Sequence, residues 1–98
     1  MTINKTRNGS SWTVAPVGRL DTTTAPQLET EINEGIDGVT ELIMDLTDLE
    51  YISSAGLRVL LSTQKKMNSL GRMIVRGVNE TIAEIFEVTG FSDILTIE

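Results

Sequence analysis

The pattern of hydrophobic and polar positions changes abruptly in the middle of the chain. Residues 41–46 are almost continuously apolar, which is typical of a strand covered on both faces, and acidic and turn-forming residues follow. Four small residues, Ser53 to Gly56, come next, and from Leu57 large apolar residues recur at helical spacing. This succession predicts a strand, a loop and a helix, with two serines where the helix begins.

The first residues of the chain predict an antiparallel hairpin. Asn8-Gly9 is a strong turn signal, and it separates a short mixed run from the β-rich residues 11–17. Pro16 cannot donate to a sheet ladder, so it favours a position near the end or edge of the second strand. Residues 18–21 are expected to end that strand.

An amphipathic helix is predicted after the hairpin. Thr22, Thr23 and Thr24 offer capping hydroxyls, and Pro26 suits a first helical turn. Apolar residues then recur at helical spacing with glutamates between them, up to a stop near Gly35 or Gly38.

The C-terminal half predicts two helices and two strands. The helix that begins near the serines should end at Gly71, and residues 73–75 indicate a short buried strand. Asn79 is a good N-cap for a last helix, and Gly90 fits the position just past its end. Residues 94–97 are expected to add a final strand.

The predicted element order is β-β-α-β-α-β-α-β, within a single domain spanning residues 1–98. Helices that alternate with strands imply crossover connections and mostly parallel pairing after the N-terminal antiparallel hairpin. We therefore expect a small α/β fold with a mixed sheet and helices packed mainly on one face.

Composition narrows the classes of function. The net charge of -6 argues against nucleic acid or an anionic membrane as a direct partner, because those need a basic face. The chain has no cysteine and no histidine, which removes disulfides, thiol chemistry, the commonest general base and the commonest transition-metal ligand. It contains no apolar run of the roughly 20 residues that a membrane span needs and no signal-peptide pattern. We expect a cytoplasmic protein without a membrane span.

Catalytic and metal sites find no support in the motifs. Ser54 lacks a G-x-S-x-G context, and Lys65 and Lys66 lie about 15 Å along the predicted helix, too far to serve as its base. Asp45 and Asp48 are more simply a strand end and a turn than part of a calcium loop. We therefore expect no enzyme activity, no catalytic residue, no metal and no cofactor.

The two serines allow two interpretations from the local residues alone. Either one is an N-cap, which contributes about 1 kcal/mol, and this is the simpler interpretation. Alternatively, Ser54 carries a phosphate of roughly -1.5 to -2 charges, which the helix dipole tolerates at its N-terminus. Ser54 could serve in both ways.

The segment from Asp45 to Leu61 closely resembles the central motif of the bacterial anti-sigma factor antagonists, which are single STAS domains. Residues 18–21, with the threonine-rich helix start after them, are similar to a second signature of that family. The order of predicted elements also matches, so the resemblance covers essentially the whole chain and implies the STAS fold.

The resemblance implies a partner-switching regulator of transcription. Unphosphorylated antagonists bind an anti-sigma factor with serine kinase activity, which frees a sigma factor, and phosphorylation by that kinase separates the two. A serine phosphatase resets the system. The modified serine lies two residues before the motif glycine, which is Ser54 here. The family often has aspartate before it, where this chain has Ser53, a second candidate hydroxyl.

The resemblance and the spacing together define a candidate partner-binding surface. Arg58 lies one helical turn after Ser54 and should share its face. Arg58 could equally be a solvated helix residue without a binding role, because residues four apart share a face whatever their function. The candidate partner-binding residues are Asp21, Ser53, Ser54, Ala55, Gly56 and Arg58. Stand-alone STAS domains also occur as non-switching accessory subunits of transporter ATPases, and this remains the alternative function.

Overall fold

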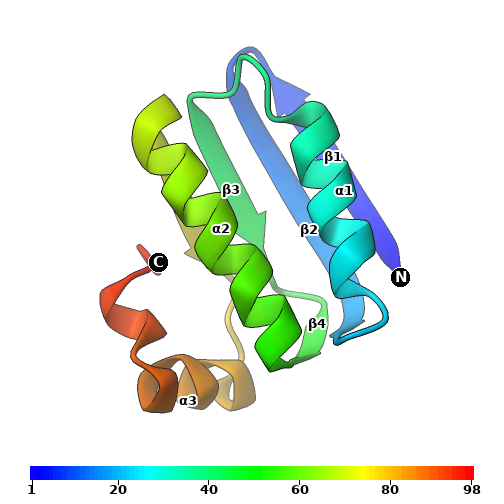
Figure 1. Ribbon diagram of the computed structural model, residues 1–98, viewed down its shortest axis with the longest axis vertical. Coiled ribbons are helices and arrows are strands. Elements are labelled where there is room, and N and C mark those ends of the chain that lie inside the picture. Colours follow the sequence, from blue (N-terminus) through cyan, green and yellow to red (C-terminus); the bar gives the residue numbers. More distant parts are fainter.

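A five-stranded mixed sheet forms the centre of the structure, a computed structural model that describes residues 1–98 (Figure 1). The strand order is β1-β2-β3-β5, and β4 pairs with the second half of β2. Only the β1–β2 pair is antiparallel. The strands are β1 (Thr2–Asn8), β2 (Ser11–Leu20), β3 (Glu41–Asp45), β4 (Leu49–Ile52) and β5 (Arg72–Arg76).

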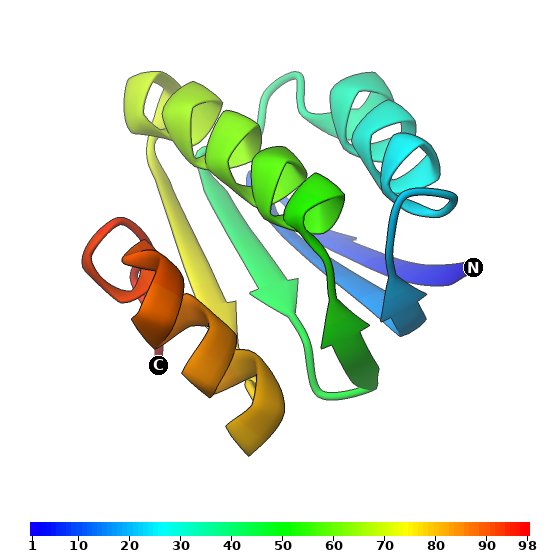
Figure 2. The same cartoon turned by 60° about the horizontal axis from the view of Figure 1, so that its bottom comes forward.

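Two helices cover one face of this sheet. Helices α1 (Ala25–Gly35) and α2 (Ser54–Leu70) lie side by side on it, whereas α3 (Glu80–Thr89) lies beyond the end of β5 (Figures 1 and 2). The predicted α/β class, with an N-terminal hairpin, parallel strands and helices mainly on one face, is therefore confirmed. None of the three helices combines the length and the apolar character needed to cross a membrane.

The hydrophobic core lies between α1, α2 and the covered face of the sheet, and α3 closes one end of it. Apolar residues spaced three or four apart on the helices pack against every second residue of the strands. This agrees with the helical period of 3.6 residues and the strand period of two. The largest fully buried side chains of the core include Leu20, Leu28, Ile32, Leu42, Met44, Leu60, Met67, Met73 and Phe86.

Strand β2 is longer than the sequence indicated. It was expected to end at residue 17, but it continues to Leu20, with a positive φ of 101° at Gly18 and a register shift between Gly18 and Arg19. The extension exists because β4 pairs with residues 18–20 of β2, while β3 pairs with residues 11–14. Strand β4 itself was not predicted, because its four residues fall within the expected loop.

Strand β3 is buried on one face only, so the expectation of cover on both faces was wrong. Leu42 and Met44 are fully buried beneath the helices, whereas Ile43 between them is half-buried on the opposite face. The alternation arises because α1 and α2 both lie on the same side of the sheet (Figure 2).

The expected last strand is reduced to a single bridge. A short 3₁₀ helix, η1 (Phe91–Asp93), follows α3, and the final residues meet β5 only at the parallel pair Val75 and Ile97. Two backbone hydrogen bonds of 2.8 Å, from Val75 N–H to the Thr96 carbonyl and from Glu98 N–H to the Val75 carbonyl, hold this contact. The tail therefore extends the sheet locally.

Candidate functional site

The two serines at the start of α2 have different environments. Ser53 is the N-cap: its backbone is extended (φ −96°, ψ 177°), and its Oγ accepts a long hydrogen bond of 3.5 Å from the Gly56 N–H. Ser54 is the first helical residue, and its exposed hydroxyl takes part in no hydrogen bond within the chain. The idea that Ser54 serves as cap and as free hydroxyl at once is therefore corrected, because the cap is Ser53.

Gly56 brings the start of α2 close to the sheet. It is buried, and a Cβ placed on it would lie 2.7 Å from Leu20 Cγ and 2.8 Å from Ile52 Cγ1. Any larger residue would push the helix away from the ends of β2 and β4. Gly56 is therefore buried beneath the candidate partner-binding surface, whereas Ser54 is exposed and Ala55 is half-buried.

Asp21 follows the end of β2 and organises the turn into α1. Its Oδ1 accepts hydrogen bonds from the Thr23 hydroxyl (2.7 Å), the Thr23 N–H (3.0 Å) and the Thr24 N–H (3.2 Å), while Oδ2 has no partner in the chain. These bonds, that of the Thr23 hydroxyl foremost, hold the pKa of the Asp21 carboxyl below its ordinary value. The carboxylate stays charged with one oxygen available to a partner.

The threonine hydroxyls do not cap α1 in the predicted way. Thr24 is its N-cap residue but makes no side-chain bond to the helix. Its hydroxyl instead donates to the Arg19 carbonyl and accepts from the Asp21 N–H, both at 2.8 Å. Thr24 therefore closes the turn after β2, because its Oγ1 points back along the chain.

A backbone hydrogen bond joins the Asp21 turn to the start of α2. The Ser53 N–H donates to the Leu20 carbonyl at 2.8 Å, and β2 and β4 run parallel, so both strands end at the same edge of the sheet. Asp21 and Ser54 each follow one of these strand ends. The tertiary structure thus brings together two candidate residues that are 33 positions apart in the sequence.

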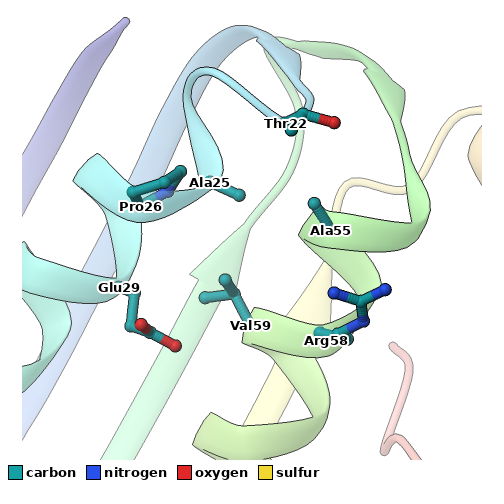
Figure 3. A pocket seen from close by; sticks show the side chains of 7 residues that line it. All are labelled: Thr22, Ala25, Pro26, Glu29, Ala55, Arg58 and Val59. Atoms are coloured by element: carbon teal, nitrogen blue, oxygen red, sulfur yellow. The ribbon is translucent and has the colours of Figure 1, made fainter.

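A groove of about 270 Å³ runs between α1 and α2 beside these residues (Figure 3). Ala55 and Arg58, both in the predicted set, line its α2 side. The α1 side was not predicted, although residues 25, 26 and 29 lie on one helical face by their spacing, with Thr22 in the turn before the helix. That spacing could have shown their common face, but not that the face meets α2. The lining residues are Thr22, Ala25, Pro26, Glu29, Ala55, Arg58 and Val59.

Two further side chains of the motif region have structural partners. The Arg19 guanidinium lies 4.5 Å from the centre of the Tyr51 ring, on the adjacent strand, in a cation–π contact. Asp45 ends β3 as expected: its Oδ1 accepts from the Thr47 hydroxyl at 2.6 Å and the Thr47 N–H at 3.1 Å. The first aspartate of the motif therefore shapes the turn that leads into β4.

Comparison with known proteins identifies relatives along the whole chain. The model of the STAS domain family matches residues 2–98. The candidate anti-sigma factor antagonist BtrV of Bordetella bronchiseptica is 35% identical over 82 residues, which are 82% of this chain and 71% of that protein. The anti-sigma-B factor antagonist of Staphylococcus aureus is 28% identical over 99 residues, with 99% of this chain and 92% of that protein covered.

Solved structures agree with these matches. A crystal structure of an anti-sigma factor antagonist from Mycobacterium paratuberculosis superimposes with a TM-score of 0.89 at 25% sequence identity. The superposition covers 98% of this chain and 83% of that one. The arrangement of sheet and helices described above is therefore an arrangement that such antagonists have.

Proposed function

The chain belongs to the STAS domain family, and from that premise we propose that it is an anti-sigma factor antagonist. Unmodified, it binds an anti-sigma factor that is also a serine kinase, and this binding releases a sigma factor. The kinase then phosphorylates Ser54, the complex separates, and a serine phosphatase restores the unmodified form. The domain itself supplies no catalytic group, since the kinase carries out the phosphoryl transfer.

The exposed, unbonded hydroxyl of Ser54 carries this proposal. It stands at the first residue of α2, where the positive end of the helix dipole favours a dianionic phosphate. The hydrogen bonds at this helix start belong to Ser53, so a phosphate on Ser54 breaks none of them. Phosphorylation would therefore change the charge and bulk of the surface without unfolding it.

Ser53 is the poorer acceptor of the two. Its side chain is half-buried, its Oγ faces the Gly56 N–H, and its own N–H is bonded to the Leu20 carbonyl. A kinase would have to break the cap to reach this hydroxyl. We therefore assign the phosphate to Ser54 alone.

Incubation with purified anti-sigma kinases and ATP, followed by mass spectrometry, tests the proposal. We expect one phosphate, on Ser54, in the wild-type chain and in Ser53→Ala, and none in Ser54→Ala. Ser54→Ala should bind the kinase and stay bound in ATP, whereas Ser54→Asp should bind weakly because a buried charge mismatch costs several kcal/mol. A folded chain that an active, binding kinase leaves unmodified would refute the switch.

The same experiment, together with co-purification, distinguishes the antagonist from the alternative function. An accessory subunit of a transporter ATPase would remain unmodified and would co-purify with that ATPase. This alternative rests on Ser53, because antagonists often have an acidic residue at that position.

A further inference from the structure

We propose that the groove between α1 and α2 receives an aliphatic side chain of the anti-sigma factor, flanked by an acidic residue facing Arg58 and a basic residue facing Glu29. This inference rests on the proposed function and adds to it the chemistry of the partner segment. It also assigns a binding role to α1, which the motif around Ser54 does not include.

The floor of the groove is aliphatic. Ala25 and Val59, from the two facing helices, are 3% and 5% exposed, and Pro26 and Ala55 stand beside them (Figure 3). The lining contains no aromatic ring and no buried polar atom without a partner. Because Ala25 and Val59 are already buried, an occupant gains free energy chiefly by covering the apolar surface of Pro26 and Ala55, at about 25 cal/mol per Å².

The size of the groove favours a side chain over a small molecule. Ligand pockets usually span about 300–1,000 Å³ and enclose most of their ligand. This groove holds about 270 Å³ and lies open between two helices (Figure 3). One projecting side chain of a protein segment fits that shape, because the rest of the segment can lie across the helix surfaces.

Two unpaired charges of opposite sign stand on opposite walls. Glu29 on α1 and Arg58 on α2 are both exposed, and neither belongs to any of the chain's ion pairs. Glu31, two residues further along α1, is already paired with Lys5 at 2.7 Å. A partner segment with one acid and one base around its aliphatic residue would meet complementary charges in one orientation only.

The groove is continuous with the phosphorylation site. Ala55 in its lining directly follows Ser54, and Thr22 directly follows Asp21. A segment seated in the groove would thus lie within reach of the Ser54 hydroxyl. We infer that the kinase that modifies Ser54 is also the protein that fills the groove.

Charge reversal on the full chain tests the pairing, with a purified anti-sigma factor that the wild-type chain binds. Glu29→Lys and Arg58→Glu should each weaken binding at least tenfold in calorimetric titration. Glu34→Lys and Lys65→Glu make the same charge changes at exposed positions of the same helices outside the groove, and should stay within twofold. Equal losses in both sets would mean a general charge effect and would overturn the proposal.

Amide chemical shifts of the ¹⁵N-labelled full chain, recorded while the same factor is added, locate the occupant. We expect Ala25 and Val59 to shift together with Ser54. Shifts at Ser54 without shifts in the groove would refute the groove and leave the antagonist function standing. If the amide shifts of the groove residues change with the concentration of the chain alone, a second copy of the chain occupies the groove. That result would also refute the proposal that the anti-sigma factor fills it. Absence of binding to every anti-sigma factor would instead refute the proposed function.

Discussion

Ser53 and Ser54 carry the same side chain but differ in role because α2 begins between them. Ser53 has extended backbone angles and turns its hydroxyl toward the first helical N–H groups. Ser54 is the first helical residue, and its side chain is exposed. One residue of displacement thus decides which hydroxyl caps the helix and which one is left exposed without a hydrogen bond.

This division predicts different stabilities for two alanine variants. Ser53→Ala should lower the free energy of unfolding by about 0.5–1 kcal/mol, the lower part of the N-cap range, because the cap hydrogen bond is long. Ser54→Ala should change it by less than about 0.5 kcal/mol, since the residue is exposed and alanine favours helix. Urea unfolding followed by circular dichroism measures both. A larger loss in Ser54→Ala would contradict the assignment of the cap.

Gly56 is the residue at which helix packing depends on a missing side chain. Gly56→Ala should lower the free energy of unfolding by about 1–3 kcal/mol, the usual cost of overpacking, because the new methyl meets Leu20 and Ile52. The helix start should also shift and weaken partner binding. Ser69→Ala, at an exposed position of the same helix, is the control and should stay within about 0.5 kcal/mol. Chemical denaturation of both variants distinguishes strain at Gly56 from a general helix effect.

At the scale of elements, the short strand β4 connects the site to the rest of the fold. It pairs with β2 on one side, leads directly into α2, and accepts a hydrogen bond from the loop before α3. The Asn79 side chain makes that connection: its Nδ2 donates to the Leu49 carbonyl, and its Oδ1 accepts from the Ile82 N–H, both at 2.9 Å. Asn79 is therefore an N-cap, as the sequence predicted, and also a bridge between α3 and β4.

Two substitutions at Asn79 separate these roles. Asn79→Ala removes cap and bridge, and should lower the free energy of unfolding by about 2 kcal/mol, roughly 1 for the cap and 1 for the hydrogen bond to Leu49. Asn79→Ser keeps a good cap but cannot reach the carbonyl, so it should lose only about 1 kcal/mol. Thermal and urea unfolding would show this order. Identical losses in the two variants would mean that the bridge contributes nothing.

For the whole molecule, hydrogen-bonded carboxylates link stability to pH. Partner hydrogen bonds hold the pKa values of Asp21, Glu41 and Asp45 below their ordinary values, mainly those from Thr23, Arg72 and Thr47 respectively. A carboxyl whose pKa is lower in the folded state stabilises the fold fully above its unfolded-state pKa. That stabilisation is lost as the pH falls through the folded-state pKa, so the domain should become less stable in acid.

Asp45 offers the clearest test of this linkage. Its ordinary pKa is 3.8, and the Thr47 hydroxyl, with Arg76 at 3.4 Å, favours its charged form. Asp45→Asn should lower stability at pH 7 and make the decline of stability below about pH 4 shallower than in the wild type. Urea midpoints measured from pH 7 to pH 2.5 show both effects. Glu84→Gln, which removes the same charge from an exposed carboxylate without side-chain hydrogen bonds, is the control, and its urea midpoint at pH 7 should stay close to that of the wild type.

Local patterns in the sequence account for most of the elements and for the class of the fold. Apolar spacing and end signals placed all three helices, including the end of α2 at Gly71, the Asn79 cap and the left-handed Gly90 after α3. They also located the hairpin and strands β3 and β5. These features depend on residues within a few positions of one another, so a local pattern contains the information.

The way in which distant segments share the candidate partner-binding surface depends instead on tertiary contacts. Strand β4 and the last three residues of β2 form because they pair with each other, and their own sequences predicted a loop and a strand end. The groove exists because α1 and α2, which are separated by two strands in the chain, lie side by side on the sheet, so that Glu29 and Arg58 line it from different helices. Ser54, rather than Ser53, is free because the Leu20 carbonyl and the buried Gly56 set where α2 begins. Pairing and packing between remote residues cannot be read from local periodicity, since the free energy that selects them is gained only when the chain has folded.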